Sequence, residues 1–116
     1  MDIKQEDLIR LWRWCGLVEQ ETGSWYENKI GGKYISATMP TLTLDHLYKF
    51  AIPKLQDKGY DIDLGAHRKG GFIANIIHFK LLTNIMLDKK YESEYSDSPT
   101  EALYNAIMKV IDNGVK

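Results

Sequence analysis

Cysteine and proline are scarce in this sequence, and long apolar runs are missing. Its 116 residues include one cysteine, Cys15, and three prolines, so a disulfide within the chain and a Cys-rich zinc site are both excluded. This cysteine usage fits a reducing, cytoplasmic setting. No apolar stretch approaches the roughly 18 residues that cross a bilayer, and the polar, acidic first residues do not resemble a signal peptide. We therefore expect no membrane association.

An excess of basic charge is also missing. The chain has 15 Lys and Arg against 16 Asp and Glu, for a net charge of −1. A general nucleic-acid binder needs a basic excess to displace counterions from phosphates, so we expect no such activity, while a local basic pocket stays open. Hydrophobic residues make up 44%, which is typical of a globular chain. The length predicts a single domain, residues 1–116.

Three segments have the apolar spacing of amphipathic helices. The first has its stripe on Leu8, Leu11, Trp12 and Cys15, with a capping box at Asp2 and Gln5 and a stop at Gly16. The second runs from Leu44 to Leu55, is capped by Thr43 or Thr41, carries Pro53 inside its pattern and ends at Gly59. The third has the strongest start signal, a capping Ser98 followed by Pro99 and Glu101, and closes at Asn113-Gly114. We expect Pro53 to kink the second helix.

The remaining segments are rich in strand formers. Leu17-Val18 predicts a short extended segment, and residues 19–40 predict a loop or weak hairpin that ends at Pro40. Residues 60–67 alternate with a period of two, turn on Lys69-Gly70-Gly71 and return through 72–79 with apolar residues on both faces. Two more strands are expected within 81–87 and at 91–95, joined by 88–90. The pattern predicts an α+β fold, with an antiparallel sheet sandwiched between α-helices.

Several of these features resemble the phage ABA sandwich domain family. The features are the Gly59-Tyr60 step that ends a helix, the Gly70-Gly71 turn, and the Ser98-Pro99-Thr100-Glu101-Ala102 helix start. Trp14-Cys15-Gly16 at the end of the first helix, followed by Trp25, fits the same layout. The resemblance covers residues 5 to 112. It implies a helix–sheet–helix sandwich of phage or prophage origin, and it implies no catalytic residues.

Groups suited to catalysis are few. The histidines His46, His67 and His78 lie in three different elements without metal-ligand spacing. Cys15 lies on the apolar stripe of its helix, which is typical of a small core residue rather than a nucleophile. We therefore expect a non-enzymatic protein with no metal and no cofactor.

Four carboxylates leave one enzymatic alternative open. Asp61 and Asp63 share one face of their strand, as do Glu92 and Glu94. If the two strands were neighbours, the four carboxylates would line one patch and could recruit a divalent cation. The simpler interpretation is that each pair is the solvated face of its strand.

The strongest binding candidate is the basic hairpin tip of His67, Arg68 and Lys69 beside Gly70-Gly71. Arg offers a bidentate fork for a phosphate, Lys offers a mobile charge, and the glycines let backbone N–H groups approach an anion. The alternative is an ordinary solvated turn.

Aromatic side chains near cations form a second candidate. Trp14, Trp25 and Tyr26, with Lys33 nearby, suit the stacking of a base and the holding of a phosphate. The same residues suit a dimer contact or core packing under a loop, and the sequence leaves the three readings open.

Together these features favour a phage-encoded binding protein in the host cytoplasm. Its ligand would be a small anion, and a nucleotide-derived host immune signal that the protein sequesters fits best. The alternatives are a protein-interaction module that inhibits or adapts a host protein, and the carboxylate-metal enzyme. Sheet edges and the aromatic segment also predict a homo-oligomer.

Overall fold

The computed structural model describes residues 3–28, 33–66, 68, 70–81 and 85–116. In chain order the elements are α1 (Gln5–Trp14), β1 (Leu17–Glu19), β2 (Trp25–Glu27), β3 (Tyr34–Ser36), α2 (Leu44–His46), the π-helical turn η1 (Leu47–Ala51), α3 (Ile52–Asp57), β4 (Tyr60–Ala66), β5 (Phe72–Leu81), β6 (Ile85–Glu92) and α4 (Pro99–Asp112). The segments α2, η1 and α3 form one uninterrupted helix. The α+β class with antiparallel pairing is confirmed.

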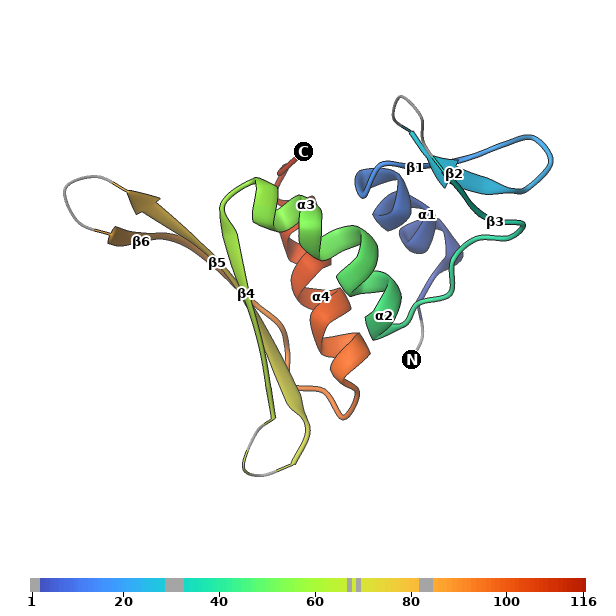
Figure 1. The fold of residues 1–116 in the computed structure, drawn as a ribbon. Coiled ribbons are helices and arrows are strands. Elements are labelled where there is room, and N and C mark those ends of the chain that lie inside the picture. Colours follow the sequence, from blue (N-terminus) through green and yellow to red (C-terminus); the bar gives the residue numbers. More distant parts are fainter. Residues whose placement is uncertain (1–2, 29–32, 67, 69, 82–84) are drawn as a thin grey trace.

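The helices lie between two sheets. One sheet has the order β1-β2-β3 and the other β4-β5-β6, and Figure 1 shows α1, α3 and α4 in the space that separates them. This layer order differs from the expected single sheet with helices on both faces. The expectation that β5 is buried on both faces is wrong. Ala74 and Ile76 are fully buried, whereas Ile73 and Ile77 on the opposite face are only partly buried.

Local capping signals place two of the helix starts correctly. The Ser98 hydroxyl accepts a hydrogen bond from the Glu101 N–H at 3.2 Å, with Pro99 in the first turn. Thr43 caps the second helix by accepting from the His46 N–H at 3.1 Å. The expected capping box of the first helix is wrong, because α1 begins at Gln5 after Lys4, which caps it without a side-chain bond. Asp2 lies outside the described residues.

The strands confirm the predicted hairpin and correct the prediction for residues 81–95. β4 pairs with β5 from Tyr60 opposite His78 to Ala66 opposite Phe72. The two later strands expected within 81–87 and at 91–95 are one strand, β6, and residues 88–90 lie inside it. The pairing of β5 with β6 shifts between His78, which lies opposite Lys89, and Phe79, which lies opposite Leu87. Lys89 and Lys90 are exposed, because β6 is an edge strand that solvent reaches. A short extended segment followed by a loop or weak hairpin was expected from residue 17 onward. The described residues 17–28 and 33–36 instead contain the three strands of the β1–β3 sheet.

The core joins both sheets to the helices through α1 and α4. Trp12 is fully buried, and its Nε1–H donates to the Pro40 carbonyl at 3.0 Å. Arg10 of α1 lies 2.6 Å from the Asp112 carboxylate of α4. Seven residues of α4 are buried, against the sheet on one side and the other helices on the other: Ala102, Leu103, Tyr104, Ala106, Ile107, Met108 and Val110.

We predict that Gly71→Ala destabilises the fold by about 1–3 kcal/mol. Gly71 has φ +83°, and a Cβ there would lie 2.8 Å from Tyr95 ring atoms and 2.9 Å from the Ser96 carbonyl oxygen. Urea unfolding measures the loss. Gly65→Ala is the control, since a Cβ at Gly65 meets no heavy atom within 4 Å. Equal stability of the two variants would contradict the prediction.

Candidate functional site

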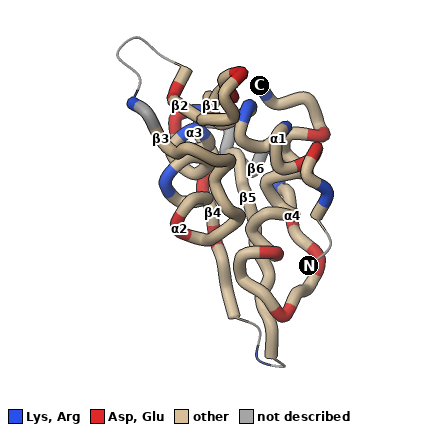
Figure 2. Tube along the Cα trace, turned by 90° about the vertical axis from the view of Figure 1, so that its right-hand side faces the viewer, with Lys and Arg blue, Asp and Glu red and all other residues tan. Residues whose placement is uncertain are grey.

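The hairpin tip lies far from the aromatic residues that the sequence paired with it. Arg68 is exposed at the end of the β4–β5 hairpin, and His67 and Lys69 lie outside the described residues. Figures 1 and 2 place this tip and the β1–β3 sheet at opposite ends of the molecule. The structure therefore does not bring Arg68 next to Trp25.

Core packing accounts for Trp25, one residue of the aromatic segment. Trp25 is 1% exposed and belongs to the core, so its ring offers no surface to a base. Trp14 is partly buried, and its Nε1–H donates to the Val115 carbonyl at 2.8 Å. Tyr26 is partly buried and Lys33 is exposed. Of the three readings that the sequence left open, burial under a loop holds for Trp25.

The four carboxylates do not form one patch. β4 and β6 pair with opposite edges of β5, so Asp63 and Glu92 are separated by two inter-strand spacings, roughly 10 Å. Glu92 pairs with Lys90 at 3.3 Å, and Glu94 lies beyond the end of β6. No group of three or more metal-ligating side chains occurs within the described part of the chain. The adjacency that a carboxylate-metal site required is absent.

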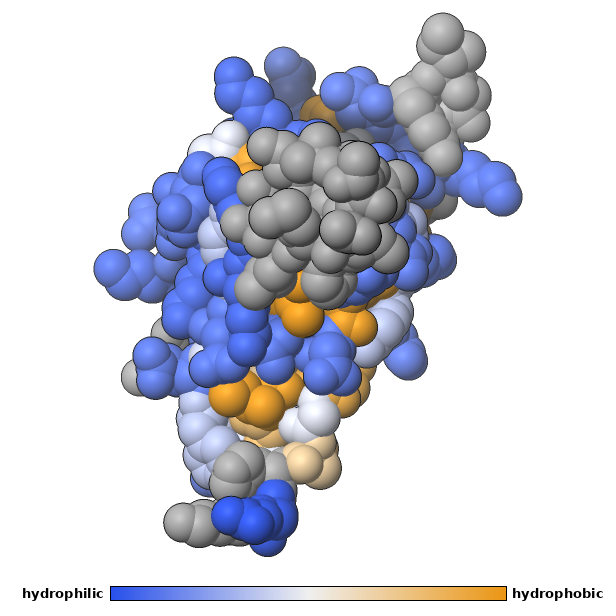
Figure 3. Space-filling model, turned by 90° about the vertical axis from the view of Figure 1, so that its left-hand side faces the viewer, coloured by the Kyte–Doolittle hydropathy of each residue, from blue (hydrophilic) through white to orange (hydrophobic). Residues whose placement is uncertain are grey.

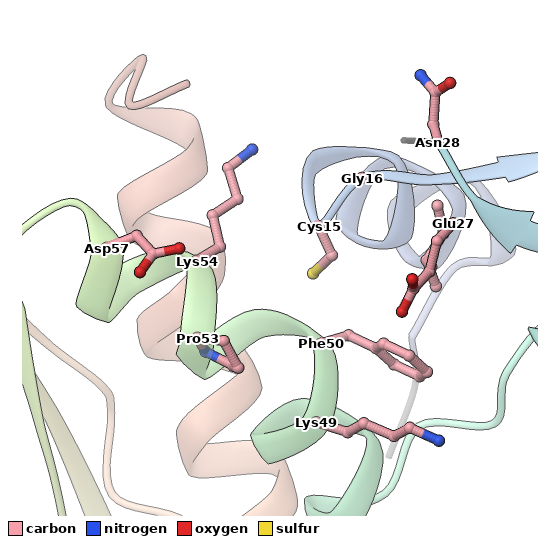
Figure 4. A pocket seen from close by; sticks show the side chains of 10 residues that line it. Cys15, Gly16, Glu27, Asn28, Lys49, Phe50, Pro53, Lys54 and Asp57 are labelled. Atoms are coloured by element: carbon pink, nitrogen blue, oxygen red, sulfur yellow. The ribbon is translucent and has the colours of Figure 1, made fainter. Parts of the chain in front are cut away.

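A cleft of about 440 Å³ opens between the end of α1, the small sheet and the second helix. In Figure 4 the Cys15 thiol lies between the α3 side of the cleft and the Phe50 ring, and the Asn28 side chain points away. The cleft is lined by Cys15, Gly16, Leu17, Glu27, Asn28, Lys49, Phe50, Pro53, Lys54 and Asp57. Of the predicted site residues that the structure describes, none lines this cleft.

Pro53 explains why the helix presents Lys49 and Phe50 as it does. In a regular α-helix the residue at 53 would donate its N–H to the carbonyl of residue 49, and proline has no N–H and crowds that carbonyl. The backbone instead forms a π-helical turn over Leu47–Ala51, in which the Ile52 N–H donates a hydrogen bond to the Leu47 carbonyl. The predicted kink is therefore a local widening of the helix. Such turns are frequent at functional sites.

Lys54 joins the second helix to the end of α1. Its Nζ donates to the Trp14 carbonyl and lies 4.4 Å from the centre of the Trp14 ring. Burial lowers the pKa of Lys54, and the nearby Lys58 charge lowers it further. Trp14, which was predicted as a ligand contact, holds the Lys54 amine over its ring at the rim of the cleft.

The Cys15 thiol is chemically quiet. Burial raises its pKa from 9.0 to about 12, although the Lys54 charge acts in the opposite direction. The thiolate is the nucleophilic form of cysteine. At neutral pH this group is therefore an unreactive thiol that forms part of the cleft wall. This agrees with the sequence interpretation of Cys15 as a packing residue.

Lys49 and Phe50 also line a second, adjoining cavity of about 220 Å³ under the segment that enters α2. Lys49 Nζ lies 5.4 Å from the centre of the Phe50 ring. His46 lies on the same side, with Nδ1 at 2.6 Å from the Thr41 carbonyl oxygen. Because a carbonyl only accepts, Nδ1 carries the proton, which leaves Nε2 as the acceptor in the neutral ring. Lys49 and Phe50 thus border both cavities.

The cleft combines groups suited to binding. It offers two amines, two carboxylates, an aromatic ring and an apolar wall, and its volume falls within the range of about 300–1,000 Å³ that is usual for ligand pockets. The sequence analysis missed it because three separate segments build it. The one local signal was Pro53 inside a helical pattern.

We predict that Cys15 reacts slowly with a disulfide reagent at pH 8 in the folded protein and quickly in urea. The same shift makes stability depend on pH. The unfolded thiol loses its proton near pH 9 while the folded protein keeps it until about pH 12, so raising the pH across that range favours unfolding. At pH 10.5 the wild type should have lost about 2 kcal/mol more than Cys15→Ser, relative to pH 8. Urea unfolding at both pH values measures the difference, and parallel losses in the two proteins would contradict it.

No family model, curated protein or solved structure matches this chain. The resemblance to the phage ABA sandwich domain family therefore stays a prediction. Among the described residues, no helix has both the length and the apolar character needed to span a bilayer.

Proposed function

We propose that this chain is a non-enzymatic binding protein whose cleft takes up a small anion with a planar ring. The observation that carries the proposal is the placement of Lys49 and Phe50 on the π-helical turn, with the amine 5.4 Å from the ring centre. Phe50 belongs to the core and is 7% exposed, so a ligand ring would contact the small part of Phe50 that lines the cleft, while the ammonium pairs with an anionic group. Lys49 is exposed, so it can reach a ligand in either of the two hollows that it borders.

The carboxylates of the cleft favour a nucleotide over a simple anion as the ligand. Glu27 and Asp57 line the same space as the two lysines, so a ligand that offers only negative charge gains nothing from these carboxylates. A nucleotide carries phosphate for the amines, and its base carries exocyclic N–H donors for a carboxylate. In Figure 4 the Glu27 carboxylate is turned toward the Phe50 ring, where a stacked base would present such donors.

Binding without turnover is supported by the state of Cys15. It is a potential nucleophile in the cleft, and its raised pKa keeps it as a thiol. The family resemblance adds the biological setting, in which a phage protein in the host cytoplasm sequesters a nucleotide-derived immune signal. A protein-interaction module is a second candidate, favoured by the uncovered face of the β4–β6 sheet.

Isothermal titration against mononucleotides, cyclic dinucleotides and inorganic phosphate tests the proposal. We expect micromolar or tighter binding of at least one nucleotide, with phosphate alone much weaker. Lys49→Gln should reduce affinity roughly tenfold, since it removes a charge-assisted contact of about 1.4 kcal/mol, and Phe50→Leu should reduce it by loss of the ring contact in the cleft.

Two matched variants test whether a loss of binding is specific to the lysine of the cleft. Lys89→Gln changes an exposed lysine on β6 and should leave binding unchanged. Arg68→Gln should also have no effect, and a loss there with none at Lys49 would move the site to the hairpin tip. Absence of heat with every nucleotide, or product formation from any of them, would overturn the proposal.

A further inference from the structure

The second cavity has the size of a subsite. Its volume is about 220 Å³, half the 440 Å³ of the cleft, and below the range of about 300–1,000 Å³ that is usual for a complete ligand pocket. Lys49 and Phe50 line both spaces. A small cavity that shares two residues with a larger one suits one part of a ligand whose remainder lies in the cleft.

Hydroxyl groups are frequent in the lining of the second cavity. Ser36, Thr38 and Thr41 each contribute a side chain with a hydroxyl group, and Thr38 and Thr41 are exposed. A hydroxyl can donate one hydrogen bond and accept others. His46 lines the same space, and the bond from its Nδ1 to the Thr41 carbonyl leaves Nε2 as the acceptor of the neutral ring. The cavity therefore offers several groups that pair with ligand hydroxyls.

The rest of the lining is apolar and carries little charge. Ile35, Met39 and Pro40 complete the wall. Among the described residues, Lys49 is the one Lys, Arg, Asp or Glu that lines this cavity, whereas two lysines and two carboxylates line the cleft. A sugar ring has hydroxyl groups at its edge and C–H groups on its faces. It therefore matches a wall of hydroxyls beside a wall of apolar side chains.

We propose that the second cavity binds a sugar that is joined through phosphate to the nucleotide in the cleft. The ligand class, which rests on the proposed function, is then a nucleotide whose phosphate is esterified to a second sugar. In Figure 4 the Lys49 side chain extends past the Phe50 ring, on the side away from Lys54 and Asp57. Because Lys49 borders both spaces, its amine binds the phosphate that links the two parts of the ligand.

Volume and charge favour a sugar over a second nucleoside. The cleft, which takes the first nucleoside, has twice the volume of the second cavity, so a second base together with its ribose would exceed the space. A base also presents N–H donors that suit a carboxylate. Glu27 and Asp57 supply carboxylates in the cleft, and no described Asp or Glu lines the second cavity.

Both spaces are separate from the β4–β6 sheet. No residue of that sheet lines either of them. Figure 3 views the molecule from the side of this sheet and shows apolar surface bordered by hydrophilic side chains. Asp61 is an exposed residue of β4, so Asp61→Asn is a control variant that should leave the affinity for every nucleotide unchanged.

Isothermal titration with matched pairs of ligands tests the proposal. ADP-ribose is compared with ADP, and UDP-glucose with UDP. We expect at least one of the two sugar nucleotides to bind roughly tenfold tighter than its matching diphosphate. The terminal phosphate of a diphosphate carries a second ionisation near pH 6, which esterification removes. Attraction to the lysines alone would therefore favour ADP and UDP, so the opposite order reports contacts with the sugar.

A double variant, Thr38→Val with Thr41→Val, tests the second cavity itself. It removes two hydroxyls and keeps the shape of both side chains, so the sugar nucleotide should lose roughly tenfold in affinity. The affinity for the matching diphosphate should stay the same, which also shows that the variant folds. Thr22→Val is the matched control, because Thr22 is an exposed threonine between β1 and β2 that lines neither space.

The outcomes separate this proposal from the proposed function. Sugar nucleotides that bind no tighter than their diphosphates, or a double variant that keeps full affinity for them, would overturn the sugar subsite. Nucleotide binding that depends on Lys49 would stand in both cases. If no nucleotide binds at all, the proposed function fails and the subsite fails with it.

Discussion

The buried indole of Trp12 is the contact on which the rest of the structure depends. Its Nε1–H bonds the Pro40 carbonyl at 3.0 Å, which ties α1 to the segment that leads from the small sheet into the second helix. Its ring makes edge contacts with His46 and Phe50 at centroid distances of 6.4 and 5.9 Å. One side chain thus closes the core and sets the position of the π-helical turn. A buried polar atom with a single suitable acceptor specifies one arrangement more strictly than apolar packing does.

One wall of the cleft depends on the effect of Pro53 on the backbone of the second helix. Proline at position 53 removes an α-helical hydrogen bond, and the helix widens one turn earlier, at the turn that contains Lys49 and Phe50. Both residues line the cleft. Lys54, one residue after the proline, reaches back to the Trp14 carbonyl. The wall formed by the helix and the wall formed by α1 are therefore joined at the rim by a side chain whose pKa burial lowers.

Signals confined to a few neighbouring residues predicted structure well. The Ser98 cap, the Thr43 cap and the β4–β5 hairpin each depend on local chemistry, and each is confirmed. Features that depend on distant neighbours were missed. Asp88 and the lysines after it read as a connector, because the sequence does not show that solvent would border β6.

The predicted binding residues also depend on which distant segments the fold brings together, which the sequence does not show. Arg68 and Trp25 were paired on chemical type, yet they lie at opposite ends of the molecule. The cleft is built from three segments, and only the fold brings them together. Whether the predicted residues bind a ligand stays a prediction, as does the phage origin.

The central place of α4 has a consequence for how the chain is made. α4 is the last element along the sequence, yet it covers the inner face of β5 and contacts α1 and the second helix as well. On the ribosome, strands β4 to β6 emerge before α4, the helix that covers the inner face of β5. The packing of α4 on β5 therefore forms only after α4 has left the exit tunnel. During that interval a nascent chain is open to chaperones and to association with other chains.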